Sequence, residues 1–259
     1  MKLTASVLAA PTAPVTANPR ILVVLPSLGT SVSALWQSAA AHLGDTDPAT
    51  TVIGIDLPGH GRSAPIDVPA GTSTVPRLTM SDLAEAVLAT IDRVLPDVVG
   101  SADAAEVRIS LAGDSIGGAI SLQMTLDHAD RFDRAAVFCT GAKIGEASGW
   151  EERAEVVATS GTPTQVIGSA QRWFGEGFMN REPEASAALL HSLQDADRFS
   201  YAAACHALAS FDIRSRLSEI AVPVLAVAGS EDQPTPPTKL AEIANGISGA
   251  LLEVIEGAA

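Results

Sequence analysis

Short apolar runs alternate with amphipathic segments up to about residue 142 and again after residue 218. The run RILVVLP (20–26) is rich in valine and leucine and ends in a turn, which is typical of a strand buried on both faces. The N-terminal stretch MKLTASVLAAP fits a first strand better than a signal peptide. Similar runs predict further strands within 51–63, 106–113, 134–141, 222–229 and 250–257.

Helical periodicity separates these strands. The pattern predicts a helix over 33–44 that stops at Gly44, and another over 79–96 that begins with the capping residues Thr79 and Ser81 and ends at Pro96. Two more helices are predicted at 116–129 and 236–246. Alternating strands and helices predict an α/β fold, with a mostly parallel sheet flanked by helices.

The alternation stops between residues 143 and 218, where four helical patterns follow one another without a strand. We interpret this stretch as a helical cap inserted over one end of the sheet. The predicted core is then formed by residues 1–142 and 219–259. Residues 62–77, which follow a Gly/Pro loop and contain three prolines, are predicted to be an irregular segment.

Composition narrows the function classes. The formal net charge is −14, and only 16 lysines and arginines are spread along the chain, which argues against a nucleic-acid-binding surface. No apolar run is long enough to span a bilayer, so no membrane partner is expected. Cys139 and Cys205 lie far apart and in predicted buried surroundings, which favours reduced thiols and a cytoplasmic location.

A serine lies between glycines in AGDSIGGA (112–119), where a predicted strand passes into a predicted helix. Gly113, Ser115 and Gly117 match G-x-S-x-G, the nucleophile elbow of α/β-hydrolases. In such an elbow the serine backbone is strained, and small neighbours allow strand and helix to approach closely. A plain turn is the alternative, whereas a dinucleotide-binding loop is excluded because Ser115 replaces its middle glycine.

A serine hydrolase of this class also needs an acid, a base and an oxyanion hole, and the triad runs in the order serine, acid, histidine. The loop GSEDQPTPP after the strand at 222–229 offers Asp232 as the better candidate and Glu231 as the other. The turn PSLGTS offers the backbone N–H of Leu28, with Gly29 as the alternative, beside that of Ile116. None of the five histidines follows Asp232, and His60 is predicted to be a structural loop residue.

Several longer stretches resemble one family. They are PSLGTS with the following LW, IDLPGHGRS, LAGDSIGGAISLQMTLDHADRFDRAAVFCTGAKIG, RWF, YAAACHALASFDIRSRLSEIAVPVLAVAGSEDQPTPP and EVIEGAA. Together they resemble the 3-oxoadipate enol-lactonases of aromatic-compound degradation over nearly the whole chain. The resemblance implies a triad histidine directly after the segment Gly257–Ala259, so the expected base lies just beyond Ala259. Some relatives carry a fused carboxymuconolactone decarboxylase domain there, which would make the full protein longer.

The lactone implied by the resemblance bears a carboxylate, which a protein of charge −14 repels unless a local cation compensates. Arg172, next to Trp173 in the predicted cap, suits this role, and Trp150 and Arg153 are weaker candidates. Gly29 is expected to matter by allowing close approach of the substrate. The alternative is that Arg172 is a surface residue and Trp173 packs within the cap.

The resulting hypothesis is a serine hydrolase that opens an enol-lactone. Ser115 attacks the ring carbonyl, the N–H groups of Leu28 and Ile116 hold the oxyanion, and Asp232 orients the histidine. Water then releases 3-oxoadipate, and the reaction requires neither metal nor organic cofactor. Alternatives are another small-ester hydrolase, a cofactor-free haloperoxidase-like enzyme, and a non-catalytic binding module of the same fold.

Overall fold

In the computed structural model, which describes residues 1–12, 18–68, 74–100 and 106–259, seven strands form one sheet in the order β1-β3-β2-β4-β5-β6-β7. β1 pairs with β3 in antiparallel fashion and all other neighbours are parallel, which confirms the predicted α/β class. The strands are β1 (Ala5–Ala9), β2 (Arg20–Leu25), β3 (Thr50–Ile55), β4 (Arg108–Asp114), β5 (Arg134–Phe138), β6 (Val224–Gly229) and β7 (Leu251–Ile255).

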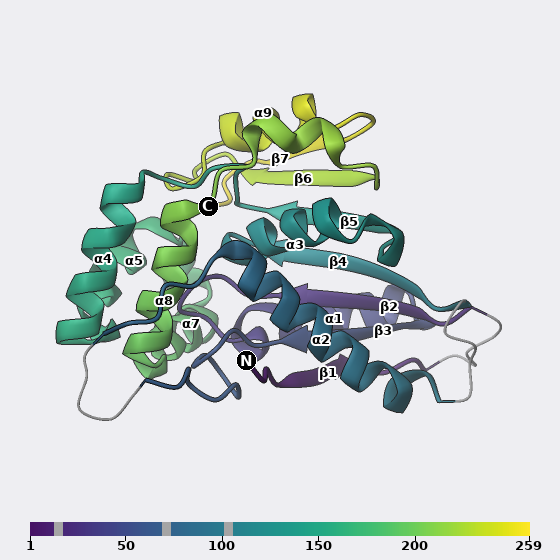
Figure 1. The fold of residues 1–259 in the computed structure, drawn as a ribbon, viewed down its shortest axis with the longest axis horizontal. Coiled ribbons are helices and arrows are strands. Elements are labelled where there is room, and N and C mark those ends of the chain that lie inside the picture. The colour runs from purple at the N-terminus through teal and green to yellow at the C-terminus, as the bar shows by residue number, and fades with distance from the viewer. Residues whose placement is uncertain (13–17, 69–73, 101–105) are drawn as a thin grey trace.

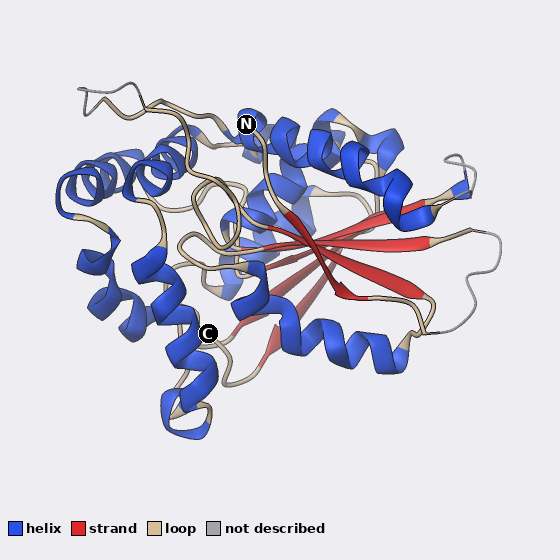
Figure 2. Ribbon diagram, turned by 90° about the horizontal axis from the view of Figure 1, so that it is seen from below, coloured by secondary structure: helices blue, strands red, loops and turns tan. Residues whose placement is uncertain are grey.

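Helices cover both faces of this sheet (Figure 1; Figure 2). α1 (Val32–Thr46) lies on one face, where Ala40 packs against Val24, Val52 and Ala112. On the other face, α2 (Met80–Val99), α3 (Ile116–Asp127) and α9 (Pro237–Gly246) share a larger apolar core with the opposite side of the strands. Because central strands are buried from both sides, their sequences read as continuous apolar runs.

Three predicted helix ends are wrong, and one of them is that of α3, which ends at Asp127, two residues before the predicted Ala129. α2 continues past Pro96 to Val99, and Gly100, at φ 60°, ends it with an N–H bond to the Pro96 carbonyl. Proline removes only one N–H donor, and Pro96 and Asp92, whose carbonyl is freed, both lie on the exposed side of the last turns. α1 likewise passes Gly44 and ends after Thr46, because glycine weakens a helix without forbidding it.

Five helices follow one another over residues 147–210, all of which are described. They are α4 (Ala147–Ser160), α5 (Val166–Arg172), α6 (Phe178–Arg181), α7 (Pro183–Asp195) and α8 (Arg198–Ser210). They lie beside the carboxyl ends of the parallel strands (Figure 1; Figure 2). We call residues 143–218 the cap, and its helices cover the sheet edge at which the candidate chemistry gathers.

The irregular segment expected at 62–77 lies partly outside the described residues, and its described parts contain neither helix nor strand. Among the helices of the described residues, none combines the length and the apolar character needed to cross a membrane.

The start of α2 provides a test of the capping assignment. Thr79 accepts from the Asp82 N–H and Asp82 accepts from the Thr79 N–H, whereas Ser81 lies inside the helix and is exposed. Thr79→Ala should lower the free energy of unfolding by about 1 kcal/mol, because a helix N–H loses its partner. Ser81→Ala should change it little. Urea denaturation of both variants measures this, and equal effects would contradict the assignment.

Candidate active site

Ser115 lies at the end of β4 with φ 53° and ψ −115°, a backbone conformation that a non-glycine residue rarely adopts. Two long-range bonds hold it there: the Ser115 N–H donates to the Phe138 carbonyl at 2.9 Å, and Thr140 Oγ1 donates to the Ser115 carbonyl at 2.7 Å. The Ser115 hydroxyl does not cap α3. It therefore remains available at the carboxyl edge of the sheet.

The flanking glycines are required by packing. A Cβ on Gly113 would lie 2.1 Å from the Gly117 carbonyl oxygen, and a Cβ on Gly117 would lie 2.6 Å from that of Leu25. Both separations are far below van der Waals contact. The small residues thus let β4, α3 and the end of β2 meet closely enough to support the strained turn.

The loop after β2 lies beside this turn, because Leu25 pairs with Gly113 in the sheet register. Within the loop the Thr30 N–H donates to the Ser27 carbonyl at 3.0 Å, and Gly29 takes φ 87°. The N–H groups of Leu28 and Ile116 donate to no backbone or side-chain acceptor among the described residues. Two unused donors at the end of β2 and the start of α3 can bind an oxyanion.

The two acids predicted after β6 have different surroundings. Asp232 is buried and accepts bonds from the Thr235 N–H at 2.8 Å and the Thr235 hydroxyl at 2.7 Å. Glu231 is exposed, and its Oε2 accepts from the Glu176 N–H in the cap at 2.7 Å. β4, β5 and β6 are neighbours, so the loop with Asp232 emerges two strands away from Ser115.

The residues after β7 lie against this acid loop. The Glu231 N–H donates to the Ala258 carbonyl at 2.8 Å, and the Gly257 N–H donates to Ser230 Oγ at 2.9 Å. A Cβ on Gly229 would lie 2.4 Å from the Ala258 oxygen, so glycine is needed for this approach. The segment Gly257–Ala259 is therefore fastened beside Asp232.

His60 is buried in the loop after β3. Its Nδ1 lies 2.8 Å from the Pro58 carbonyl oxygen, and its ring stacks on Tyr201 with centroids 6.2 Å apart. Burial lowers the pKa of His60, against the raising effects of the Pro58 bond, Asp56 and Asp197. Nδ1 is thus engaged by its own loop and the ring face by Tyr201 of the cap, whereas the buried Nε2 has no hydrogen-bond partner among the described residues.

The cap places two arginines close together. Arg172, half-buried at the end of α5, has its pKa lowered by burial and by the charge of Arg153. The Arg153 guanidinium lies 4.7 Å from the centroid of Trp150, whose Nε1 donates to the Ile144 carbonyl at 2.6 Å. Neither arginine forms an ion pair with a carboxylate of the described residues. Trp173 is half-buried and packs against the main core.

Tyr201 connects these arginines with the predicted oxyanion loop. It is buried, interacts electrostatically with both guanidinium groups and hydrogen-bonds Arg153. Its Cε2 would lie 3.3 Å from a Cβ on Gly29, and Leu193 Cδ1 would lie 2.5 Å away. The close approach at Gly29 is therefore made by cap side chains.

Sequence reasoning missed Asp114, which lies between the elbow and the acid loop. Ser27 Oγ donates to Asp114 Oδ2. Burial raises the pKa of Asp114 to about 7, the Ser27 bond opposes this shift, and the charge of Asp232 adds to it. The available signal was an acid directly before the serine of the motif, at the last position of a strand that ends at the sheet edge.

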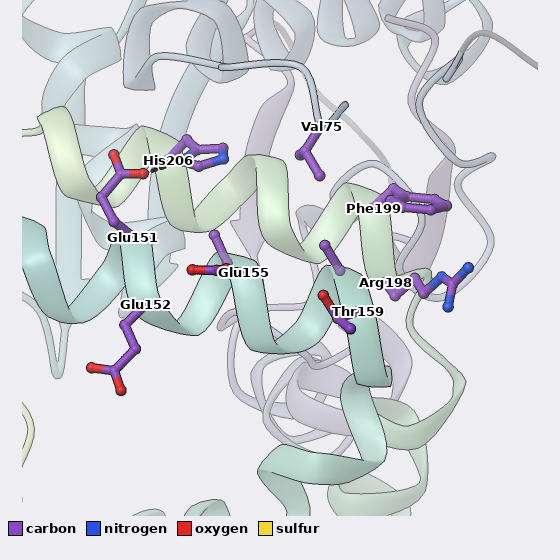
Figure 3. A pocket seen from close by; sticks show the side chains of 10 residues that line it. Val75, Glu151, Glu152, Glu155, Thr159, Arg198, Phe199 and His206 are labelled. Atoms are coloured by element: carbon purple, nitrogen blue, oxygen red, sulfur yellow. Dashed lines mark ion pairs between the residues drawn. The ribbon is translucent and has the colours of Figure 1, made fainter. Parts of the chain in front are cut away.

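A hollow of about 810 Å³, which we call the outer hollow, lies on the cap between α4 and α8 (Figure 3). Glu151 points toward His206 there, and its Oε2 lies 3.0 Å from His206 Nδ1. Arg77 Nη1 donates to the same carboxylate at 3.2 Å and connects the segment before α2 with the cap. None of the predicted site residues lines this hollow.

Comparison with known proteins identifies the family to which this fold belongs. The alpha/beta hydrolase family matches residues 22–259. The 3-oxoadipate enol-lactonase 2 of Acinetobacter baylyi is 32% identical over 231 residues, which cover 89% of this chain and 78% of that protein. The 3-oxoadipate enol-lactonase 1 of the same organism is 31% identical over 218 residues, covering 84% and 73%. The crystal structure of the enol-lactonase from Burkholderia xenovorans LB400 has a TM-score of 0.81 at 28% identity, covering 99% and 88%.

The chain therefore belongs to the alpha/beta hydrolase family, and it is a hydrolase. Within the family it is similar to 3-oxoadipate enol-lactonases over most of its length, which confirms the resemblance indicated by its motifs.

The packing at the elbow can be tested with two glycines that both lie in helices. Gly117→Ala places a methyl group against the Leu25 carbonyl and should lower the free energy of unfolding by about 2 kcal/mol or more. Gly149→Ala in α4 meets no atom within 4 Å and should stabilise slightly through helix propensity. Thermal unfolding of the two variants measures the difference. A Gly117→Ala protein as stable as Gly149→Ala would disprove the close approach.

Proposed function

We propose that the protein is a serine hydrolase that opens a small lactone bearing a carboxylate, such as 3-oxoadipate enol-lactone. The observation that carries the proposal is the strained Ser115, which is held beside two unused backbone donors at Leu28 and Ile116. The names of the relatives supply the substrate. The same interactions stabilise a tetrahedral oxyanion in any acyl-transfer reaction.

In the proposed reaction Ser115 Oγ attacks the lactone carbonyl while its proton passes to the base. The carbonyl oxygen becomes an oxyanion that accepts from the N–H groups of Leu28 and Ile116. The bond from the carbonyl carbon to the ring oxygen then breaks, and the base returns its proton to that enol oxygen. Water hydrolyses the acyl-enzyme, and the enol product tautomerises to the ketone.

Asp232 is proposed as the acid that orients the base, in preference to Glu231. Its carboxylate is buried and held by Thr235, and it keeps further lone pairs for an imidazole N–H. Glu231 is instead exposed and accepts a hydrogen bond from the Glu176 N–H of the cap. A fixed, desolvated carboxylate orients a histidine better than a solvated one.

The proposed base is a histidine at the position directly after Ala259. Its support is the resemblance together with the contacts of Gly257 and Ala258 on the acid loop, which bring the end of β7 beside Asp232. No histidine follows Asp232 in the 259 residues. These residues alone should thus hold the nucleophile, the acid and the oxyanion donors in place without the base.

The substrate carboxylate is proposed to bind Arg172, assisted by Arg153. Two guanidinium groups without a carboxylate partner among the described residues repel each other, and an anionic ligand relieves that repulsion. The Trp150 ring packs against the Arg153 guanidinium, and Trp173 is proposed as an apolar wall of the substrate site. Both cysteines are free thiols, which supports the proposed cytoplasmic location.

The base assignment can be tested by extending the chain. We expect the 259-residue protein to react slowly with a serine-directed fluorophosphonate. A version extended by His-Gly-Gly should react faster by about 10⁴-fold or more, since the triad base then activates the serine. Extension by Ala-Gly-Gly is the matched control, and Ser115→Ala should abolish labelling. Mass spectrometry identifies the modified residue.

The possible outcomes separate the assignments. Labelling of Ser115 at equal rates in all three chains would contradict the histidine while leaving the nucleophile in place. An unlabelled Ser115 in the extended chain would contradict the serine-hydrolase proposal.

The substrate site can be tested in the histidine-extended protein. Arg172→Ala should lower kcat/KM for the carboxylate-bearing lactone by about 10- to 100-fold, mainly through KM, because a charge-assisted contact is lost. Activity on a neutral aryl acetate should change little. Arg198→Ala is the control, since this cap arginine lies over the Phe199 ring in the outer hollow. Equal losses on both substrates would remove Arg172 from the site.

A further inference from the structure

Asp114 occupies a junction that the proposed reaction does not use. It is the last residue of β4 and pairs with Phe138 of β5 in the sheet register. Its side chain is half-buried and lines a solvent-open cavity of about 210 Å³ together with Trp36, Cys139 and Ala258. The loop after β2, the end of β5 and the acid loop all meet at this carboxylate.

The contact with the loop after β2 is direct. Ser27 Oγ donates to Asp114 Oδ2, and the Ser27 carbonyl accepts from both the Thr30 N–H and the Thr30 hydroxyl, each at 3.0 Å. Ser27 is therefore fixed at its side chain by Asp114 and at its backbone by Thr30. Leu28 and Gly29 lie between these two attachments.

The groups that face Asp114 from neighbouring elements are neutral or acidic. Asp232 approaches from the loop after β6 and the Cys139 thiol from the end of β5, while α1 and the segment after β7 contribute apolar residues to the cavity. Burial, together with the charges of Asp114 and Asp232, raises the pKa of Cys139, so the thiol stays neutral. No lysine, arginine or histidine lines the cavity among the described residues.

Partial burial of a carboxylate without a neighbouring cation is costly, and the hydrogen bond from Ser27 is the compensating contact that the structure provides. We propose that Asp114 is a positioning residue, which holds the turn from Ser27 to Thr30 against the elbow so that the Leu28 N–H faces Ser115 Oγ. Its catalytic consequence rests on the serine-hydrolase function proposed above. Its effect on the turn is a property of the 259-residue fold itself.

The ionisation of Asp114 should regulate this contact. The pKa of Asp114 is raised to about 7, so the carboxylate passes between its neutral and charged forms near neutral pH. The charged form accepts the stronger bond from Ser27. The turn should therefore be held more firmly above pH 7 than below it. The free energy of unfolding should nevertheless fall as pH rises from about 4 to about 7, because over this range the folded state binds a proton at Asp114 that the unfolded state has lost.

The first experiment needs no enzymatic activity. In the ¹⁵N-labelled 259-residue protein, the amide resonances of Leu28 and Gly29 should shift with a midpoint near pH 7. Asp114→Asn, which keeps the shape and can still accept a bond, should abolish the shift. Ser27→Ala, which removes the donor, should also abolish it, whereas Glu231→Gln on the neighbouring acid loop should leave it unchanged.

The proposal would be overturned if the amide resonances of Leu28 and Gly29 still titrated near pH 7 in Asp114→Asn, or no longer titrated in Glu231→Gln. A flat titration of Leu28 and Gly29 in the wild-type protein would also overturn it. The two substitutions at Asp114 and Ser27 act on different elements, so misfolding of one variant still leaves the other as a test.

The second experiment uses the histidine-extended protein and reads kcat separately from KM. Ser27→Ala should lower kcat about tenfold at pH 8 with KM nearly unchanged, because the contact acts on the oxyanion and not on substrate binding. Asp114→Asn should remove the part of the kcat–pH profile centred near 7. Adding Asp114→Asn to Ser27→Ala should cause no further loss, since both act through one bond.

The outcomes distinguish the two proposals. An inactive extended protein whose Leu28 amide still titrates through Asp114 would contradict the serine-hydrolase function and keep the positioning role. An active protein in which the two substitutions are additive would contradict the positioning role and keep the function.

Discussion

The strained backbone of Ser115 is the constraint on which the rest of the structure depends. A positive φ at a serine costs free energy, and it persists only where the surroundings hold it. Here the support comes from hydrogen bonds to Phe138 and Thr140 and from glycines at 113 and 117 that tolerate carbonyl contact. β2, β4, β5 and α3 therefore all converge on one residue.

The parallel arrangement of the strands brings the other candidate groups to the same place. The loops after β2, β4 and β6 leave the sheet at one edge, and the segment after β7 turns back onto the last of them. The cap covers this edge and brings Leu193 and Tyr201 onto Gly29 (Figure 1). The shared position of the backbone donors and the acid is a consequence of strand direction.

Electrostatics divides the edge into two zones. On the sheet side, Asp114 is half-buried beside a cavity that no cation among the described residues lines, and its pKa is raised by burial, with the charge of Asp232 adding to the shift. On the cap side, Arg153 and Arg172 lie near each other without a carboxylate, and the pKa of Arg172 falls. In a chain of net charge −14, two arginines without a carboxylate partner among the described residues are a local concentration of positive charge in the cap.

The sequence by itself determined the order of strands and helices and the run of helices in the cap. It also determined the placement of Gly113, Ser115 and Gly117 between strand and helix. These features follow from periodicity and turn chemistry, which are local properties of the chain. Tertiary structure decided what depends on distant neighbours. α2 passes Pro96 because that turn is solvated, Glu231 turns to the cap while Asp232 is buried, and Arg153 comes close to Arg172. Ser27 meets Asp114 across 87 positions of sequence, and only strand pairing makes them neighbours.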